Sequence, residues 1–510
     1  MEIGTLSSEN HKIRAVNASL GLRQNLLLLA SAAVVTLSLA APSYAQTNDL
    51  AGSSRISPPG CTFPALTNAT ANFRTGNDVS GQSHCIGFFS SNNNISGEDN
   101  NFGAFSNSNN VSGDNNTLEN FSDSNNVSGA NNTLDGDAND VSGENNALDG
   151  DSNHVSGANN TLANNNDTNI VSGNNNTLGS FSDSNNVSGA NNTLGFLNAS
   201  NTVSGENNTL DGDANLVSGE NNTLDGDSNH VSGDNNTLAN NNDTNIVSGN
   251  NNTLGSFSDS NNVSGENNTL GNSNDANILG GSSNNVGSSN ENNTITGSRN
   301  FIGSNNNSNA ISSVGAIIGN NNNSNILGGN YVGIGNFNVA NSLTGTNNSL
   351  GNNNTSNNVS GSSNFIISNN YANTIGGQNQ FISSNNVGND VQGSGNFVLN
   401  SNFYNAVSGN NNTLGSQNRS NIVGGGTNNV SYNNAYNTVG GRNQNLSSDN
   451  VGNDVQGSGN SLAIANFDNA VSGSYNILGS GNVGNIVGGR INSVSNSNFC
   501  LLYTSDAADE

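Results

Sequence analysis

Aliphatic residues recur at a fixed interval from residue 79 onward. Val, Ile or Leu anchors run from Val79 to Val487 at steps of 16 residues, except for steps of 14 between Val127 and Val155 and between Val203 and Val231. A second aliphatic ladder follows the first by seven residues, as at Leu118. Asn stands two positions before every anchor of the first ladder and before most members of the second. The polar bulk of the chain is therefore a tandem repeat.

Each repeat contains two segments of the form Asn-x-aliphatic, separated by turns rich in Gly and Asn. Alternate residues of a strand point to the same side, so Asn and the aliphatic residue should both face inward. Gly and Asn are weak helix formers, which argues against helices. We therefore predict an all-β parallel β-solenoid, or left-handed β-roll, of about 27 two-strand coils with 14 or 16 residues each. Stacked amides should form ladders that satisfy the buried donors and acceptors.

The N-terminal region has the pattern of an export signal. Lys12, Arg14 and Arg23 precede an apolar run over residues 26–41, and Ser43-Tyr44-Ala45 is a small-x-small cleavage site. Export to the extracellular space or the bacterial cell surface (outer membrane) is expected. The predicted divisions are a signal peptide (1–45), a linker or N-terminal cap (46–76), the solenoid (77–496) and an irregular tail (497–510), whose final eleven residues resemble a translated sequencing adapter.

Two cysteines lie near the predicted start of the solenoid. Cys61 and Cys85 are 24 residues apart. Oxidising compartments favour disulfides, so an exported chain is expected to pair them and close the first coil. The alternative is two free thiols.

Composition removes several classes of function. Only 31% of residues are hydrophobic, Trp is absent, and the formal net charge is −27. Nine Lys and Arg are too few for binding nucleic acid or an anionic membrane. Between Glu98 and Asp275 there are 24 acidic residues and no Lys or Arg. A thin core and a strongly acidic N-terminal half are expected.

The short coils divide into heptapeptides that begin with Gly, as at Gly129 and Gly136. Two such heptapeptides per coil resemble the head repeats of YadA-like trimeric autotransporter adhesins. The resemblance implies a surface adhesin that binds host or environmental ligands, either matrix protein or polysaccharide, as a homotrimer. The chain departs from the family by placing Asn fourth and polar residues fifth and seventh, so an apolar face for packing three chains is not evident.

Asp-Gly-Asp-x-Asn occurs once in each short coil. Alternating oxygen donors suit Ca²⁺, which could bridge successive coils. The alternative is a solvated turn whose Asp and Gly satisfy turn geometry. The candidate ligands are Asp135, Asp137, Asn139, Asp149, Asp151, Asn153, Asp211, Asp213, Asn215, Asp225, Asp227 and Asn229.

A row of Thr is expected on one outer face of the solenoid. A flat Thr array is one way to bind ice, and the alternative is the β-propensity of Thr on a solvent face. The positions are Thr117, Thr133, Thr161, Thr177, Thr193 and Thr209.

Nothing in the pattern indicates catalysis. His84, His154 and His230 are the only His after the signal, and no His/Asp/Ser or metal-binding cluster can be built from them. We therefore expect a non-enzymatic adhesin or structural rod that binds through a repetitive exposed face and requires no cofactor. The alternatives are an ice-binding β-solenoid and a Ca²⁺-binding extracellular structural protein of a biofilm or S-layer type.

Overall fold

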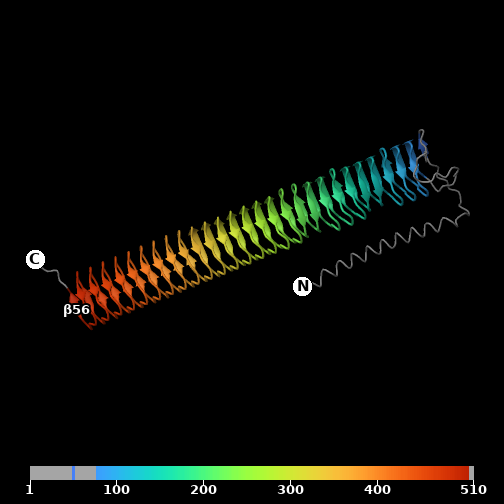
Figure 1. The fold of residues 1–510 in the computed structure, drawn as a ribbon. Helices are drawn as coiled ribbons and strands as arrows, with labels where there is room; N and C mark the ends of the chain where they lie inside the picture. Colours follow the sequence, from blue (N-terminus) through green and yellow to red (C-terminus); the bar gives the residue numbers. More distant parts are fainter. Residues whose placement is uncertain (1–48, 52–75, 505–510) are drawn as a thin grey trace, which may run out of the picture. The chain divides into compact units, whose positions relative to one another are not determined.

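Two compact units divide the chain after Asp49, and the second contains the solenoid. The computed structural model describes residues 49–51 and 76–504. The predicted signal peptide and most of the predicted linker lie outside these residues. Residues 76–504 form a rod in which one coil stacks on the next along the whole length (Figure 1). Among the described residues, no helix is long and apolar enough to cross a membrane.

Two parallel sheets run along the rod. The first has 29 strands and contains the even-numbered strands together with β1 (Asp49–Ala51); the second contains the odd-numbered strands β3 (Cys85–Ile86) to β55 (Ser493–Val494). Each strand pairs in register with the same element one coil later, so that Val127 pairs with Val141 and Leu134 with Leu148. The predicted parallel β-solenoid of about 27 two-strand coils is confirmed.

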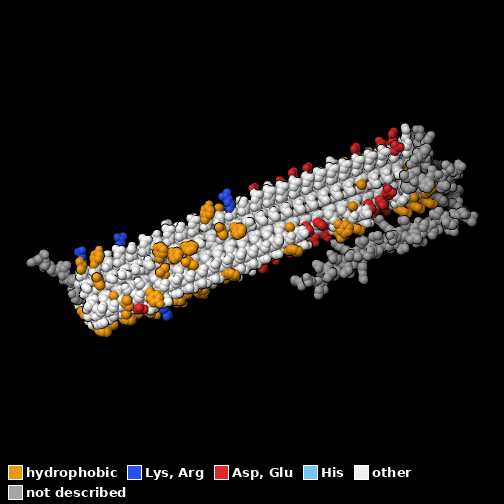
Figure 2. All heavy atoms as spheres, viewed as in Figure 1, with side chains coloured by type: hydrophobic (Ala, Val, Ile, Leu, Met, Phe, Trp, Pro, Cys, Tyr) orange, Lys and Arg blue, Asp and Glu red, His pale blue; other side chains and the backbone are white. Residues whose placement is uncertain are grey.

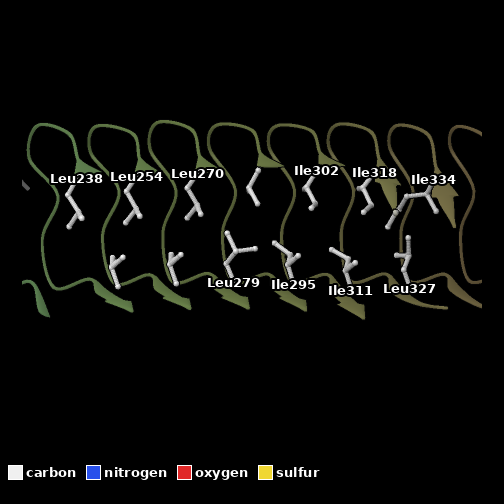
Figure 3. Packing of buried hydrophobic residues seen from close by; sticks show 14 of the residues in the cluster. Leu238, Leu254, Leu270, Leu279, Ile295, Ile302, Ile311, Ile318, Leu327 and Ile334 are labelled. Atoms are coloured by element: carbon white, nitrogen blue, oxygen red, sulfur yellow. The ribbon is translucent and has the colours of Figure 1, made fainter. Parts of the chain in front are cut away.

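The aliphatic anchors of the two sheets form the core. Figure 3 shows the row Leu238, Leu254 and Leu270 of the second sheet facing the row Leu279, Ile295 and Ile311 of the first. These side chains are almost fully buried. Two aliphatic residues per coil therefore suffice, because the remaining interior is filled by Asn.

The expected Asn ladders are present. In the ladder of the first sheet, Asn93 Nδ2 donates to Asn77 Oδ1 at 3.0 Å and to the Ser106 carbonyl at 2.8 Å. The Asn93 backbone N–H donates to the same Asn77 Oδ1 at 3.0 Å. The buried amide is thus satisfied by its neighbours along the axis, which removes the cost of burying an unpaired polar group.

A glycine ladder marks the turn after the first sheet. Gly173 has φ 112°, a conformation that L side chains rarely adopt, and the carbonyl of Gly189 in the next coil occupies the place of a Cβ. The same relationship repeats between Gly189 and Gly205. Glycine is required here because successive coils approach too closely for a side chain.

The coil has a third side that the two-strand description did not include. This side lies in the segment that connects the second sheet to the first sheet of the next coil. Isolated parallel bridges there join equivalent residues of neighbouring coils, for example Asp259 with Asp275 and Val387 with Phe403. The 14-residue coils have a shorter connection at this point, which keeps both sheets in register with their 16-residue neighbours.

The two ends of the rod differ in strand length. Strands of the first sheet have up to five residues in the N-terminal half, as in β4 (Asn94–Glu98), and two residues from β38 (Asn358–Val359) to β52 (Ala470–Val471). The predicted irregular tail contributes one further strand, β56 (Leu502–Thr504), which pairs with β54 (Ile486–Gly488).

Candidate functional site

The most regular surface of the rod is a row of Thr on the second sheet. Each Thr directly precedes a buried Leu, so the Leu side chain points inward and the Thr side chain outward. The strands that carry the row are β7 (Thr117–Leu118), β9 (Thr133–Asp135), β11 (Ala147–Asp149), β13 (Thr161–Leu162), β15 (Thr177–Leu178), β17 (Thr193–Leu194), β19 (Thr209–Asp211), β21 (Thr223–Asp225), β23 (Thr237–Leu238), β25 (Thr253–Leu254) and β27 (Thr269–Leu270).

Backbone pairing fixes the spacing of this row. Thr161 pairs with Thr177, Thr177 with Thr193, and Thr253 with Thr269, each one coil apart. Neighbouring strands lie about 4.8 Å apart, so the hydroxyl and methyl groups repeat at that interval. Ala147 is the single interruption between Thr117 and Thr269. The six Thr predicted from the sequence extend to ten in the structure, with Thr223, Thr237, Thr253 and Thr269 added.

The row is held rigid from inside. Asn176, immediately before Thr177, donates from Nδ2 to Asn160 Oδ1 at 3.1 Å and to the Gly189 carbonyl at 3.0 Å. Leu178, immediately after Thr177, is fully buried. Each Thr is therefore fixed between two interior anchors.

The position after each Leu determines how flat and how polar the face is. It is Ala163, Gly179 and Gly195 beside one stretch of Thr, and Ala239, Gly255 and Gly271 beside another. These small residues leave the Thr side chains as the outermost groups. In the short coils the same position is acidic, at Asp135, Asp149, Asp211 and Asp225. Carboxylates therefore divide the row into uncharged patches.

The outer face of the first sheet is less regular. Its row of Ser from Ser80 to Ser264 is uninterrupted, but hydroxyls such as Ser188 Oγ donate to the backbone of the next coil, here to the Val203 carbonyl at 3.3 Å. The outward position before the anchor varies between residues as different as His154 and Ile170. This face offers no array of one side-chain type.

The candidate calcium ligands do not converge. Asn139, Asn153, Asn215 and Asn229 are buried members of the interior ladder, and Asn139 Oδ1 accepts the Asn153 backbone N–H at 2.9 Å. The Asp side chains of the motif lie outside this ladder: the Asp137 backbone N–H donates to Asp151 Oδ1 at 2.7 Å. Within residues 49–51 and 76–504, no group of three or more His, Cys, Asp or Glu is arranged to hold a metal ion. The structure instead shows a turn in which the Asp carboxylate accepts a hydrogen bond from a backbone N–H of the preceding coil.

Carboxylates of adjacent coils influence one another. Partial burial, followed by the negative charges of Asp225, Asp213 and Asp227, raises the pKa of Asp211. Partial burial also raises the pKa of Asp183, with a smaller contribution from the charge of Asp167 and an opposing hydrogen bond from the Asp167 backbone. Two of the carboxylates that act on Asp211 belong to the next short coil.

The His and Cys residues occupy separate places. His84 is buried at the start of the second sheet's Asn ladder, where Nδ1 accepts the Asn100 N–H at 3.3 Å. His154 is exposed on the first sheet with Nδ1 3.0 Å from Asp140 Oδ2, and His230 lies on the same sheet in a different coil. Cys85 forms a disulfide; Cys61, its expected partner, lies outside the described residues, so the pairing stays a prediction.

Sequence reasoning missed a third interior ladder. It lies four residues after the second aliphatic anchor and contains Ser or Asn, as at Asn166 and Ser182. The Ser182 N–H donates to Asn166 Oδ1 at 2.6 Å, and the Asn290 N–H donates to Asn274 Oδ1 at 2.9 Å. The signal was present as a 16-residue recurrence of Asn, but it lies in a segment with no aliphatic residue to mark it.

Comparison with known families corrects the expected resemblance. The family described as the grass antifreeze beta roll matches residues 164–256, which contain six members of the Thr row, Thr177, Thr193, Thr209, Thr223, Thr237 and Thr253. No YadA-like or autotransporter family is indicated, so the resemblance to adhesin heads is wrong. A Gly-led heptapeptide with one inward aliphatic residue is compatible with many two-strand rolls, so it does not discriminate among families. A search of curated proteins found no match. From residue 164 to residue 256, the chain is similar to an antifreeze β-roll.

Proposed function

We propose that the chain binds ice through the Thr row of the second sheet. The observation that carries the proposal is the in-register repetition of one outward residue type over successive coils, from Thr161 to Thr269 without interruption. A rigid array at constant spacing can hold water in a fixed lattice, because each Thr presents one hydroxyl and one methyl in the same geometry. Because the fold already holds the Thr side chains in place, binding to ice costs less conformational entropy.

The family match to the antifreeze β-roll supports the same proposal, because it covers six successive coils of the uninterrupted part of the Thr row, from Thr177 to Thr253. The adhesin or structural-rod interpretation has no comparable support. The calcium-dependent alternative is weakened by the burial of the Asn member of every Asp-Gly-Asp-x-Asn motif. We further propose that the protein is exported, since ice and its growth surfaces are met outside the cell.

A paired substitution tests the face directly. Thr177→Tyr with Thr193→Tyr places two large side chains on the proposed ice-binding surface. Ile170→Tyr with Asn186→Tyr places the same side chains on the first sheet, at exposed positions of the same coils. We expect the first pair to abolish most of the thermal hysteresis of the full chain and the second pair to leave it intact. Absence of ice shaping by the unmodified protein, or equal loss in both variants, would overturn the proposal.

A further inference from the structure

The third side of the coil changes its chemistry halfway along the rod. One outward position per coil forms a continuous row there, linked by parallel backbone bridges from Asp259 to Phe499. In the N-terminal half, this position forms an acidic row, interrupted by Ala199, of Asp123, Asp137, Asp151, Asp167, Asp183, Asp213, Asp227, Asp243, Asp259, Asp275 and Glu291. After two Asn it becomes an apolar row of Val339, Tyr371, Val387, Phe403, Ala435, Val451, Phe467, Val483 and Phe499, interrupted by Thr355 and Arg419.

The apolar row is exposed to solvent. Tyr371 is 53% exposed and Phe403 39%. Beside the row, Tyr404 is 62% exposed, and its ring lies over Gly388 of the preceding coil, where it would contact an added Cβ. Figure 2 shows acidic side chains gathered toward the N-terminal end of the visible face and more hydrophobic ones toward the C-terminal end. A largely apolar, exposed strip of this kind marks an interaction surface.

The area of the strip fits a protein partner. Five aromatic side chains lie along or beside it between residues 337 and 436, namely Phe337, Tyr371, Phe403, Tyr404 and Tyr436. A large aromatic side chain buries 150–250 Å² in full, so these half-exposed rings offer on the order of 500 Å². The aliphatic and small residues between them bring the strip near the ~800 Å² per partner of a stable interface. Arg419 is the one charged residue among the row positions from Val339 to Phe499.

We propose that this strip, from Val339 to Ala435, is where two copies of the chain pack together in antiparallel orientation. A second copy presents the same side chains at the same coil spacing, so the two rows can interdigitate over their whole length. Such a two-fold contact uses one patch twice, which is the commonest arrangement of soluble dimers. The strip and the Thr row occupy different sides of the coil, so the dimer leaves the Thr row accessible.

Charge selects the antiparallel orientation. Parallel, in-register packing would place the eleven carboxylates of one acidic row against those of the other, and like charges in contact are unfavourable. An antiparallel pair centred on Val387 sets Tyr371 opposite Phe403 and Arg419 opposite Thr355. The two acidic halves then point away from each other at opposite ends.

Sedimentation of the full chain tests the surface. At about 10 µM, we expect the unmodified protein to be a dimer and Val387→Asp with Phe403→Asp to weaken its association at least tenfold. The matched control, Phe365→Asp with Phe397→Asp, adds the same charges at exposed positions of the second sheet, in the coil before that of Val387 and in the coil of Phe403, and should leave the dimer intact. Circular dichroism of each variant checks that the solenoid is retained. A monomer, a trimer, or a dimer that only the control pair disrupts would overturn the proposal.

Distance measurement tests the orientation. Cys500 is an exposed free thiol outside the proposed contact and can carry a nitroxide label. Seven coils separate Val387 from the coil of Cys500, so antiparallel packing places the two labels about 67 Å apart at about 4.8 Å per coil. Parallel packing would bring them close together, and a short electron–electron distance would overturn the orientation.

Discussion

Asn169 bridges Asn153 of the preceding coil and Ser182 of its own coil through a single side-chain amide. Its Nδ2 donates to Asn153 Oδ1 at 3.0 Å and to the Ser182 carbonyl at 2.6 Å. Its Oδ1 accepts the backbone N–H and the side-chain Nδ2 of Asn185, at 2.9 and 3.0 Å. One amide thus satisfies buried groups of three coils, which explains how a core with few aliphatic residues can be stable.

Asn169→Ala should be strongly destabilising. The substitution strands the Asn185 N–H groups and the Ser182 carbonyl in the interior, at about 1–3 kcal/mol for each unsatisfied group. We therefore expect the free energy of unfolding to fall by at least about 2 kcal/mol in urea titrations. Asn186→Ala, at an exposed position of the next coil, is the control and should change it by less than about 0.5 kcal/mol. Equal effects in the two variants would contradict the ladder as the source of stability.

Gly173→Ala tests the glycine ladder. A Cβ there would overlap the Gly189 carbonyl in a backbone conformation with φ 112°. Adoption of such a conformation by a non-glycine residue costs on the order of 1–3 kcal/mol before the overlap is counted. The control is Gly280→Ala, because the atoms nearest to its Cβ are Ser264 Oγ at 3.5 Å and Thr296 Cγ2 at 3.9 Å. The melting temperature should fall clearly in the first variant and hardly in the second.

Removal of charge from the Thr face should strengthen ice binding. Asp135, Asp149, Asp211 and Asp225 lie beside the Thr row and separate its uncharged patches. A carboxylate orients the water around it in an arrangement that differs from the ice lattice. We therefore expect replacement of all four Asp by Asn to increase thermal hysteresis. The control replaces four Asp of the third side by Asn and should leave the thermal hysteresis unchanged. Its positions are Asp123, Asp183, Asp243 and Asp259. A decrease in the first variant would show that the carboxylates belong to the binding surface.

The stability of the acidic half should rise on mild acidification. The pKa of Asp211 is raised in the folded state, so the folded chain binds protons before the unfolded chain does. The free energy of unfolding therefore increases as the pH falls through the folded pKa toward the unfolded value of 3.8, and this gain is lost as the pH rises again. Thermal melts across this range should show the increase, and Asp211→Asn should reduce it.

Glu220→Gln serves as the control for the acid-dependent stability. It removes one carboxylate from an exposed edge of the same region. It should leave the pH dependence near that of the unmodified protein. A pH profile that Asp211→Asn does not alter would contradict the assignment.

The sequence by itself determined the solenoid, its register, the inward Asn and the outward Thr. In Asn-x-Val and Asn-Thr-Leu, the Asn lies directly before a strand and the aliphatic residue within it. Alternation along this extended segment, with a fixed coil length, decides which residue faces inward and which residue it stacks on. The 16-residue step predicted that Thr177 lies between Thr161 and Thr193, as observed.

Only the tertiary structure decided what happens on the third side. The in–out alternation of side chains fails there because residues such as Ala138 (φ 60°) and Thr168 (φ 63°) adopt the left-handed backbone conformation. The residues on either side of such a position then point to different sides of the chain. For this reason Asn139 enters the core while Asp137 stays outside it, which separated the proposed calcium ligands. The stacking of coils then gathered residues 14 or 16 apart into one acidic row and one apolar row, which share a side of the rod because they share a position in the coil.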